Sequence, residues 1–222
     1  MQHIRDYTST PKNPPKSQKT PESTGPCVEE TLLQWGQVQV SGPFEVPNRV
    51  HRNGSRTINT KPTVISSFWK DCVGEKLSGK NGCYVFAVQA GPAIIPWYVG
   101  RTTSQTFALE CFAGQKPLRY DEALGNYRAC TPLLFLLESS SALAKTQIKK
   151  LEQFLIELAA AVNPKIQQTK GIPRPSWVIP GVTQSNGKGG VADAVLKFRD
   201  AFNLERPKGI KTKKKKRAQK GS

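Results

Sequence analysis

The chain has 222 residues, of which 33 are lysine or arginine and 16 are aspartate or glutamate, so its formal net charge is +17. Such an excess of positive charge argues against a protein that handles small cations, and it predicts a polyanionic partner, with nucleic acid first. We expect no membrane partner, because the sequence has no apolar stretch long enough to span a bilayer and no basic amphipathic helix to lie on lipid.

The cysteines and the N-terminus indicate the compartment. The five cysteines are odd in number and lack a CxxC pair, and the N-terminus lacks the basic and then apolar pattern of a signal peptide. We therefore expect reduced thiols in a cytoplasmic protein, associated with the nucleoid in a bacterium or placed in the nucleus in a eukaryote. The sequence predicts neither an oligomeric state nor a structural zinc site.

Composition divides the chain into four segments. These are a disordered basic, Pro-rich arm (1–30), an appended extended element (31–65), a folded domain (66–204) and a disordered polybasic tail (205–222). The extended element is expected from short apolar pieces separated by the turn residues Gly42-Pro43 and Asn53-Gly54.

A β-hairpin is the clearest feature of the folded domain. The run from Cys83 to Val88 is apolar on both faces and predicts a central strand. Gly91-Pro92 predicts the turn and residues 94–99 the returning strand, so Gly82 and Gly100 are expected near the same end of the hairpin. Pro96 cannot donate to a ladder and is expected at the start of its strand or on an open side.

The other periodic segments complete the predicted fold. We expect helices at 66–77, 105–112, 117–129, 144–162 and 191–202, and a third buried strand at 133–137. Together these elements predict an α/β domain with a central, mainly antiparallel three-stranded sheet flanked by helices.

One residue of the helix at 144–162 does not fit its apolar face. Glu152 projects between Ile148 and Leu155 on the side that should face the core. An unpaired carboxylate buried there would cost roughly several kcal/mol or take up a proton, so Glu152 needs a metal ion or a cation as its partner. The alternative is a glutamate at the edge of the core that reaches solvent or pairs with a lysine such as Lys149.

Two tyrosine motifs lie on the predicted hairpin, Gly82-Cys83-Tyr84 and Tyr98-Val99-Gly100. They resemble the signature of the GIY-YIG nuclease superfamily, and the resemblance covers about residues 81–170. It implies a small α/β domain that cuts nucleic acid with a divalent metal. We therefore expect an endonuclease that hydrolyses phosphodiester bonds in DNA with Mg²⁺ or Mn²⁺, with RNA as the alternative substrate.

The resemblance also implies roles for individual residues. A family glutamate on the helix after the third strand binds the metal, and an asparagine just past that helix supports the site; these correspond to Glu152 and Asn163. Tyr84 would be the general base or its positioner, and Tyr98 would orient water or phosphate. Because the pKa of a free tyrosine is about 10, such a base needs cations nearby. The alternative for Asn163, which precedes Pro164, is a plain helix stop.

The sequence departs from the family where an arginine is usual, about two turns beyond the second motif. Ala108-Leu109-Glu110 stands there instead. Arg101, Lys116 and Arg119 are the cations that can replace the arginine, since a guanidinium need only meet the phosphate bidentately. Arg101 as an ordinary surface residue is the alternative.

A looser resemblance connects the chain with a divergent bacterial subgroup of the same family. It is carried by Glu110-Cys111-Phe112, Lys116 with Tyr120, Tyr127, and Cys130-Thr131-Pro132. In this resemblance Glu110 and Lys116 become site residues in place of the arginine. We interpret Trp97 as a packing residue rather than a platform for base stacking.

The tail from residue 206 onward has nine lysines and arginines and no acid. Its densest run is Lys213, Lys214, Lys215, Lys216 and Arg217. Such a block predicts an arm that adds salt-sensitive, sequence-independent affinity for DNA. Two other interpretations remain open: a catalytically inactive nucleic-acid-binding module with a GIY-YIG-like fold, and a tail that serves as a nuclear-localisation or ribosome-binding signal.

Overall fold

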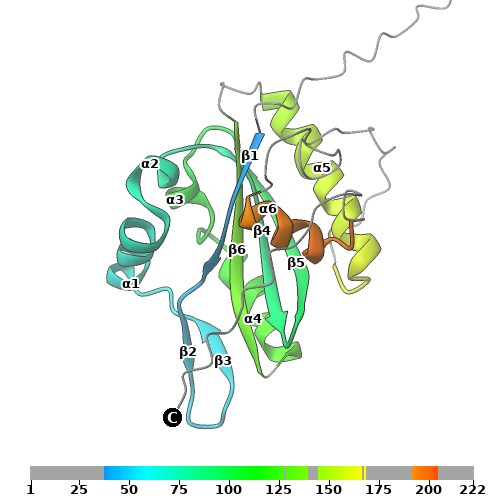
Figure 1. Ribbon diagram of the computed structural model, residues 1–222. Helices are drawn as coiled ribbons and strands as arrows, with labels where there is room; N and C mark the ends of the chain where they lie inside the picture. The colour runs from blue at the N-terminus through cyan, green and yellow to red at the C-terminus, as the bar shows by residue number, and fades with distance from the viewer. Residues whose placement is uncertain (1–37, 128, 140–144, 167, 169–191, 205–222) are drawn as a thin grey trace, which may run out of the picture. The chain divides into compact units, whose positions relative to one another are not determined.

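A computed structural model describes residues 38–127, 129–139, 145–166, 168 and 192–204 (Figure 1). All of them belong to the second of two compact units, residues 32–222. The arm expected at 1–30 and the tail expected at 205–222, with its lysines and Arg217, lie outside the described residues. No helix in the described ranges is both long and apolar enough to cross a membrane.

The main sheet of the described residues has four strands in the order β1-β6-β4-β5. They are β1 (Val38–Glu45), β4 (Gly82–Ala90), β5 (Ala93–Thr102) and β6 (Cys130–Ser139). Neighbouring strands pair antiparallel throughout. The predicted α/β architecture around an antiparallel sheet is confirmed, but the expected number of three strands is wrong.

The additional strand, β1, comes from the segment that we expected to be an appended element. Val38 and Val40 are each 8% exposed and belong to the core, and Val40 pairs with Leu137 of β6. β6 is an apolar strand, and without β1 its edge would present unpaired backbone groups. The sequence signal for β1 was weak because its alternation breaks at Gly42-Pro43, where the register also shifts.

β4 and β5 form the predicted hairpin, with Tyr84 opposite Gly100 and Gly82 opposite Thr102. The ladder has a bulge, because Phe86 pairs with Tyr98 while Ala87 pairs with Pro96. Trp97 is the additional residue, so Trp97 and Tyr98 both join the same hydrophobic cluster. Pro96 is tolerated because β5 is an edge strand.

Helices and a small hairpin surround the sheet. They are β2 (Asn48–Val50), β3 (Arg56–Ile58), α1 (Pro62–Ser67), a π-helical segment η1 (Phe68–Val73), α2 (Glu75–Ser78), α3 (Phe107–Glu110), α4 (Lys116–Asn126), α5 (Lys145–Val162) and α6 (Asp193–Ala201). The single helix expected at 66–77 is thus replaced by three short pieces, with a proline in the first turn of α1.

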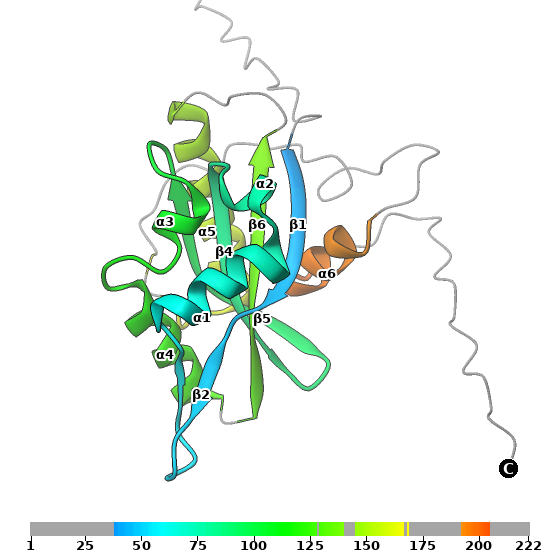
Figure 2. The same ribbon diagram turned by 90° about the vertical axis from the view of Figure 1, so that its left-hand side faces the viewer.

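The alternation of β4 gives the sheet two different faces. Cys83, Val85 and Ala87 point to α5 and α6, which together cover what we call the α5 face. Tyr84, Phe86 and Val88 point the other way, to η1, α3 and α4, on what we call the tyrosine face. Figure 1 shows α5 and α1 on opposite sides of the sheet, and Figure 2 shows α1 and α2 crossing in front of it.

Candidate active site at the edge strand

Gly100 is the point where the two tyrosine motifs meet. A Cβ atom on Gly100 would lie 2.2 Å from Cζ and 2.3 Å from the hydroxyl oxygen of Tyr84, which is a severe clash. Only glycine therefore lets the phenol ring of Tyr84 lie across the edge strand β5. The first motif has a similar requirement, since a Cβ on Gly82 (φ +151°) would lie 2.1 Å from the carbonyl oxygen of Leu137.

Three tyrosines gather on this face. The Tyr84 and Tyr98 rings have centroids 6.2 Å apart at 29°, and the Tyr98 and Tyr120 centroids are 5.8 Å apart at 72°. The Tyr120 hydroxyl donates to the carbonyl oxygen of Cys111 at 2.8 Å. Phe86 stacks on Tyr120 with centroids 4.0 Å apart. These contacts hold the ring of Tyr98 against that of Tyr84 at the edge of the sheet.

The Tyr84 hydroxyl is buried, and no group among the described residues forms a hydrogen bond of good geometry with it. It lies close enough to the hydroxyls of Tyr98 and Tyr120 to lower, in part, the raised pKa of each. Burial raises the pKa of Tyr84, and burial followed by the charge of Glu152 raises the pKa of Tyr98. Both phenols are therefore protonated near neutral pH, and Tyr84 offers a buried donor rather than a base.

The charged residues of the site reach the same edge from the α5 face. Arg101 lies opposite Cys83 in the ladder, and its Nη1 donates to Oε2 of Glu152 on α5. The side chain of Glu152 is 16% exposed and that of Arg101 is 36% exposed. Glu152 does have the cation that its buried position requires, and that cation is Arg101.

Burial and neighbouring cations act in opposite directions on Glu152. Burial raises the pKa of Glu152 above its usual value, and the guanidinium of Arg101 and then the ammonium of Lys149 lower it in part. The net shift is upward, so the ion pair does not fully compensate for the desolvation of the carboxylate.

A second ion pair joins α3 to the start of α4. Lys116 Nζ lies 2.5 Å from Oε1 of Glu110 and also donates to the backbone carbonyl of Glu110 at 2.8 Å. The two side chains are 18% and 26% exposed, respectively. The pair therefore lies at the rim of the site, next to the tyrosine rings.

A cavity of about 350 Å³ brings these groups together. Six of the seven residues expected in the catalytic site line it: Tyr84, Tyr98, Arg101, Glu110, Lys116 and Glu152. Sequence reasoning missed residues 102–105, three with hydroxyls and one with an amide, which also line the cavity. Their position directly after the second tyrosine motif was the available signal.

Asn163 lies outside this cavity and has a structural partner. It is 3% exposed, its Nδ2 donates to the carbonyl oxygen of Pro96 at 2.9 Å, and its Oδ1 accepts the N–H of Lys165 at 3.1 Å. Gln168 makes a similar contact, since its side-chain amide bonds both the N–H and the carbonyl of Val99, at 2.9 and 2.7 Å. The segment after α5 thus satisfies backbone groups on the open edge of β5.

The metal donors of the site are few. Within the part of the chain that the structure describes, no group of three or more His, Cys, Asp or Glu side chains could hold a metal ion. Glu152 and Glu110 are the described carboxylates that line the cavity, and each faces a cation. Arg101, Lys116 and the partly buried Tyr98 line the cavity together, and a phosphate is the kind of group that such cations and a hydroxyl bind.

We compared the chain with known proteins in three ways. A scan against protein-family models, a search of curated proteins and a search of solved structures each found no match.

Proposed function

We propose that this chain is a divalent-metal-dependent endonuclease of the GIY-YIG type that hydrolyses phosphodiester bonds in DNA. The observation that supports this proposal is the single cavity that gathers six of the expected residues from β4, β5, α3, α4 and α5. These residues are up to 68 positions apart in the sequence, counting from Tyr84 to Glu152. Chemically suitable groups from five elements have converged beside the edge strand β5, which carries Gly100.

Glu152 suits a Mg²⁺ site that relies on the substrate for most of its ligands. Protein Mg²⁺ sites commonly use one or two carboxylates, several waters and substrate phosphates. Glu152 can take this part once Arg101 turns from the carboxylate to the phosphate. When bound, the ion would stabilise charge on the phosphate and the leaving oxygen and would lower the pKa of the attacking water.

Arg101 is the residue that changes partner in this proposal. Its side chain is 36% exposed, so the guanidinium can turn toward a phosphate in the cavity without leaving a buried position. Bidentate contact to two phosphate oxygens would place positive charge where negative charge increases during the displacement. Arg101 thereby takes the place of the arginine that the family carries further along the chain.

The two tyrosines and Lys116 position the reacting groups. Tyr84 is fully buried and its hydroxyl stays protonated, so its part is to hold the ring of Tyr98 in position. Tyr98 contributes its hydroxyl to the cavity. Lys116 stays beside Glu110 and adds a positive charge at the entrance. The expected role of Tyr84 as general base gives way here to its other expected role, positioning.

A catalytically inactive nucleic-acid-binding module is the second candidate. The observation that favours it is that, in the described residues, each carboxylate of the cavity already faces a cation of this chain. Such a module would bind DNA with a steep salt dependence, and adding a divalent metal would produce no cleavage.

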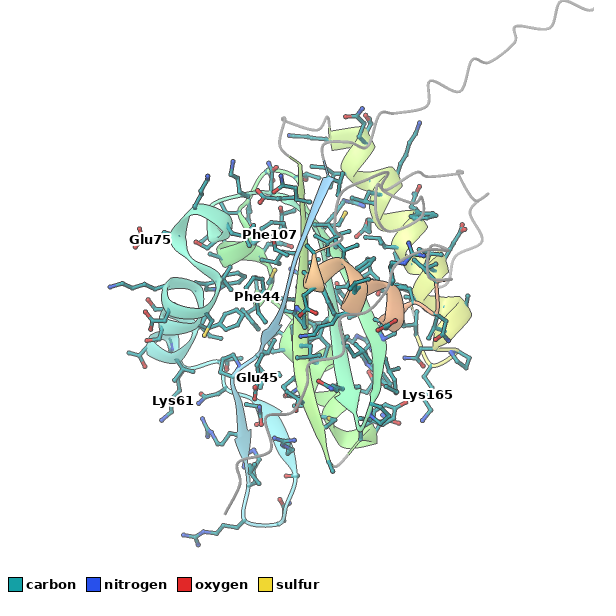
Figure 3. All side chains as sticks on the ribbon, viewed as in Figure 1. Phe44, Glu45, Lys61, Glu75, Phe107 and Lys165 are labelled. Atoms are coloured by element: carbon teal, nitrogen blue, oxygen red, sulfur yellow. The ribbon has the colours of Figure 1, made fainter. Side chains whose placement is uncertain are left out.

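The decisive experiment is a cleavage assay on plasmid, branched and single-stranded DNA, with matched RNA, in the presence of Mg²⁺ or Mn²⁺. We expect the wild-type chain to cut DNA and Glu152→Gln to lose cleavage while it keeps DNA binding. Glu75→Gln is the matched control, because Glu75 lies on the side of the sheet opposite α5, near α1 and α2 (Figure 3). If none of the DNA forms is cut with either metal, the nuclease proposal fails.

Deleting residues 206–222 separates the tail from the chemistry. We expect weaker DNA binding and a shallower salt dependence, because the slope falls by about 0.9 for each phosphate that the tail no longer neutralises. The cleavage rate at saturating DNA should stay the same. Abolished cleavage with unchanged binding would show that the tail belongs to the catalytic site.

A further inference from the structure

A second, larger cavity of about 560 Å³ adjoins the first along β5. It shares Tyr98 and Lys116 with the first cavity, so one nucleic-acid strand can contact both cavities. Its other walls come from β5, from the start of α4 and from the segment after α5. Apart from the two shared residues, these walls play no part in the proposed metal site, and their own chemistry indicates a different ligand.

The charge of this second cavity favours an anion. Lys116, Arg119 and Lys165 line it, against the single described lining carboxylate of Glu122. Glu122 lies 3.6 Å from Arg119, while Lys116 pairs with Glu110 at the first cavity. Lys165 is held in place by the Asn126 side chain, whose Oδ1 accepts from Nζ at 3.1 Å. Figure 3 shows Lys165 beside the edge of the sheet formed by β5. A phosphate of a bound chain would be attracted here as well as in the first cavity.

The same cavity has an aromatic wall. The bulge in β5 places Trp97 and Tyr98 on the same face, and both line the cavity. Tyr127 supports Trp97 from behind, with ring centroids 6.1 Å apart at 89°. Lys165 Nζ lies 5.9 Å from the Tyr127 centroid, so the cation is next to the ring that contacts Trp97. Aromatic rings next to phosphate-binding cations are the combination that holds a base and its backbone.

The size of the cavity selects one unit rather than a duplex. Cavities of about 300–1,000 Å³ accommodate single small molecules. A base reaches such a cavity only when it is unpaired or has been turned out of its stack. Gln168 and Asn163 satisfy the open edge of β5 on this side, so the wall is preformed rather than created by the ligand.

We propose that the second cavity binds one unpaired nucleotide of the substrate, next to the phosphate held in the first cavity. Its base lies against the partly buried ring of Tyr98 and reaches only the margin of Trp97, which is 6% exposed and packs in the core as the sequence predicted, and its phosphate lies near Arg119 and Lys165. This rests on the proposed nuclease function for the content of the first cavity. It makes DNA with an unpaired nucleotide beside the cut the favoured substrate class.

The test compares two short DNA duplexes that share one strand. In the first duplex the other strand pairs with it fully, and in the second it lacks one nucleotide, so that a single nucleotide of the shared strand is unpaired. Affinities are measured without metal, using the full chain, so that binding is separated from cleavage. We expect roughly tenfold tighter binding of the ligand with the unpaired nucleotide, in the range that one base stacked on an aromatic ring provides. The polybasic tail affects both ligands alike and cancels in the ratio.

Variants then locate the effect. Arg119→Ala combined with Lys165→Ala, and Lys165→Ala alone, should lower the affinity ratio, because the phosphate of the unpaired nucleotide loses a cation, and thermal melting should show that both variants remain folded. Lys76→Ala, an exposed lysine on α2, is the matched control and should keep the wild-type ratio. Quenching of tryptophan fluorescence by a mononucleotide such as dAMP should be reduced in Trp97→Phe.

The outcomes separate this proposal from the nuclease proposal. Equal affinity for the two DNA ligands, or an unchanged ratio in folded Lys165→Ala, would overturn the nucleotide site even if the chain cuts DNA. A preserved ratio with no cleavage of any substrate would support the nucleotide site and defeat the nuclease.

Discussion

The two faces of the sheet contribute different chemistry to one cavity. The tyrosine face supplies packed aromatic rings, protonated hydroxyls and the Glu110–Lys116 pair, whereas the α5 face supplies the more buried charged pair of Arg101 and Glu152. They meet at β5 because this strand lies at the edge of the sheet and carries Gly100 opposite Tyr84. The site therefore depends on the edge position of β5 as much as on the groups themselves.

The polar groups on the two faces also differ in how well they are satisfied. On the tyrosine face the Tyr84 hydroxyl has no good hydrogen-bond partner among the described residues, whereas Tyr120 bonds Cys111. On the α5 face Glu152 has a partner that only partly offsets its burial. A buried hydroxyl and a carboxylate with a raised pKa thus come to one cavity from the two faces.

Gly100→Ala should have the largest effect on this arrangement, because it removes the point where the two faces meet. The new methyl group would overlap the phenol of Tyr84, so we expect unfolding to become easier by about 1–3 kcal/mol or more, together with loss of DNA cleavage. Denaturant unfolding and the cleavage assay measure the two effects. Gly125→Ala in α4, where nothing lies within 4 Å of an added Cβ, is the control and should be neutral or stabilising.

Arg101→Ala tests two proposed roles of Arg101 on the α5 face: that it binds the phosphate, and that it competes with the metal ion for Glu152. We expect cleavage to fall by about 10²–10³-fold, as loss of one transition-state donor does. Binding of Mn²⁺ to the free protein, measured by calorimetry, should become tighter because Glu152 is released. Weaker Mn²⁺ binding would show that Arg101 supports the metal site rather than competing with it.

Two tyrosine variants contrast a satisfied and an unsatisfied hydroxyl on the tyrosine face. Tyr120→Phe breaks the hydrogen bond to Cys111 and should lower the free energy of unfolding by about 1 kcal/mol. Tyr84→Phe should leave stability unchanged or slightly raised, because its hydroxyl is buried without a good partner. Equal destabilisation by both variants would argue for a structural role of the Tyr84 hydroxyl.

The smallest expected effect is a pH dependence from the α5 face. Because the pKa of Glu152 is raised above its usual value of 4.5 in the folded state, the folded chain binds more protons than the unfolded chain between the two values. Wild-type stability should therefore fall as the pH rises through the window just above 4.5, relative to Glu152→Gln. Denaturant unfolding at several pH values measures this difference, and a rise would mean that Arg101 outweighs burial.

Local patterns in the sequence predicted much of the fold. The β4-β5 hairpin, the third strand within β6 and the helix around Glu152 all follow from runs of apolar residues and from turn residues next to one another. Tyr84, Tyr98, Arg101 and Glu152, which line the first cavity, lie on these elements. The helix at residues 145–162 could be predicted because its apolar residues recur with the helical period within one short stretch of sequence.

Pairings between distant residues could not be predicted from the sequence. Glu152 was expected to need a cation, but its partnership with Arg101 spans 51 positions and depends on how α5 packs across β5. Asn163 was expected in the site or as a helix stop; it does follow the last residue of α5, and its contact with Pro96, 67 positions away, was not foreseen. The strand β1 pairs with β6 and thereby satisfies the backbone groups of an apolar strand that would otherwise lie at the edge of the sheet.

The amino-acid sequence was enough to place two tyrosines on neighbouring strands of a hairpin and a misplaced glutamate on a helix. It took the packed fold to show that these groups share a cavity, which cation Glu152 faces and that the Tyr84 hydroxyl is left without a good partner among the described residues. The physical reason is that a strand or helix is specified by neighbours in the chain, whereas charge compensation and burial depend on atoms brought together only by packing.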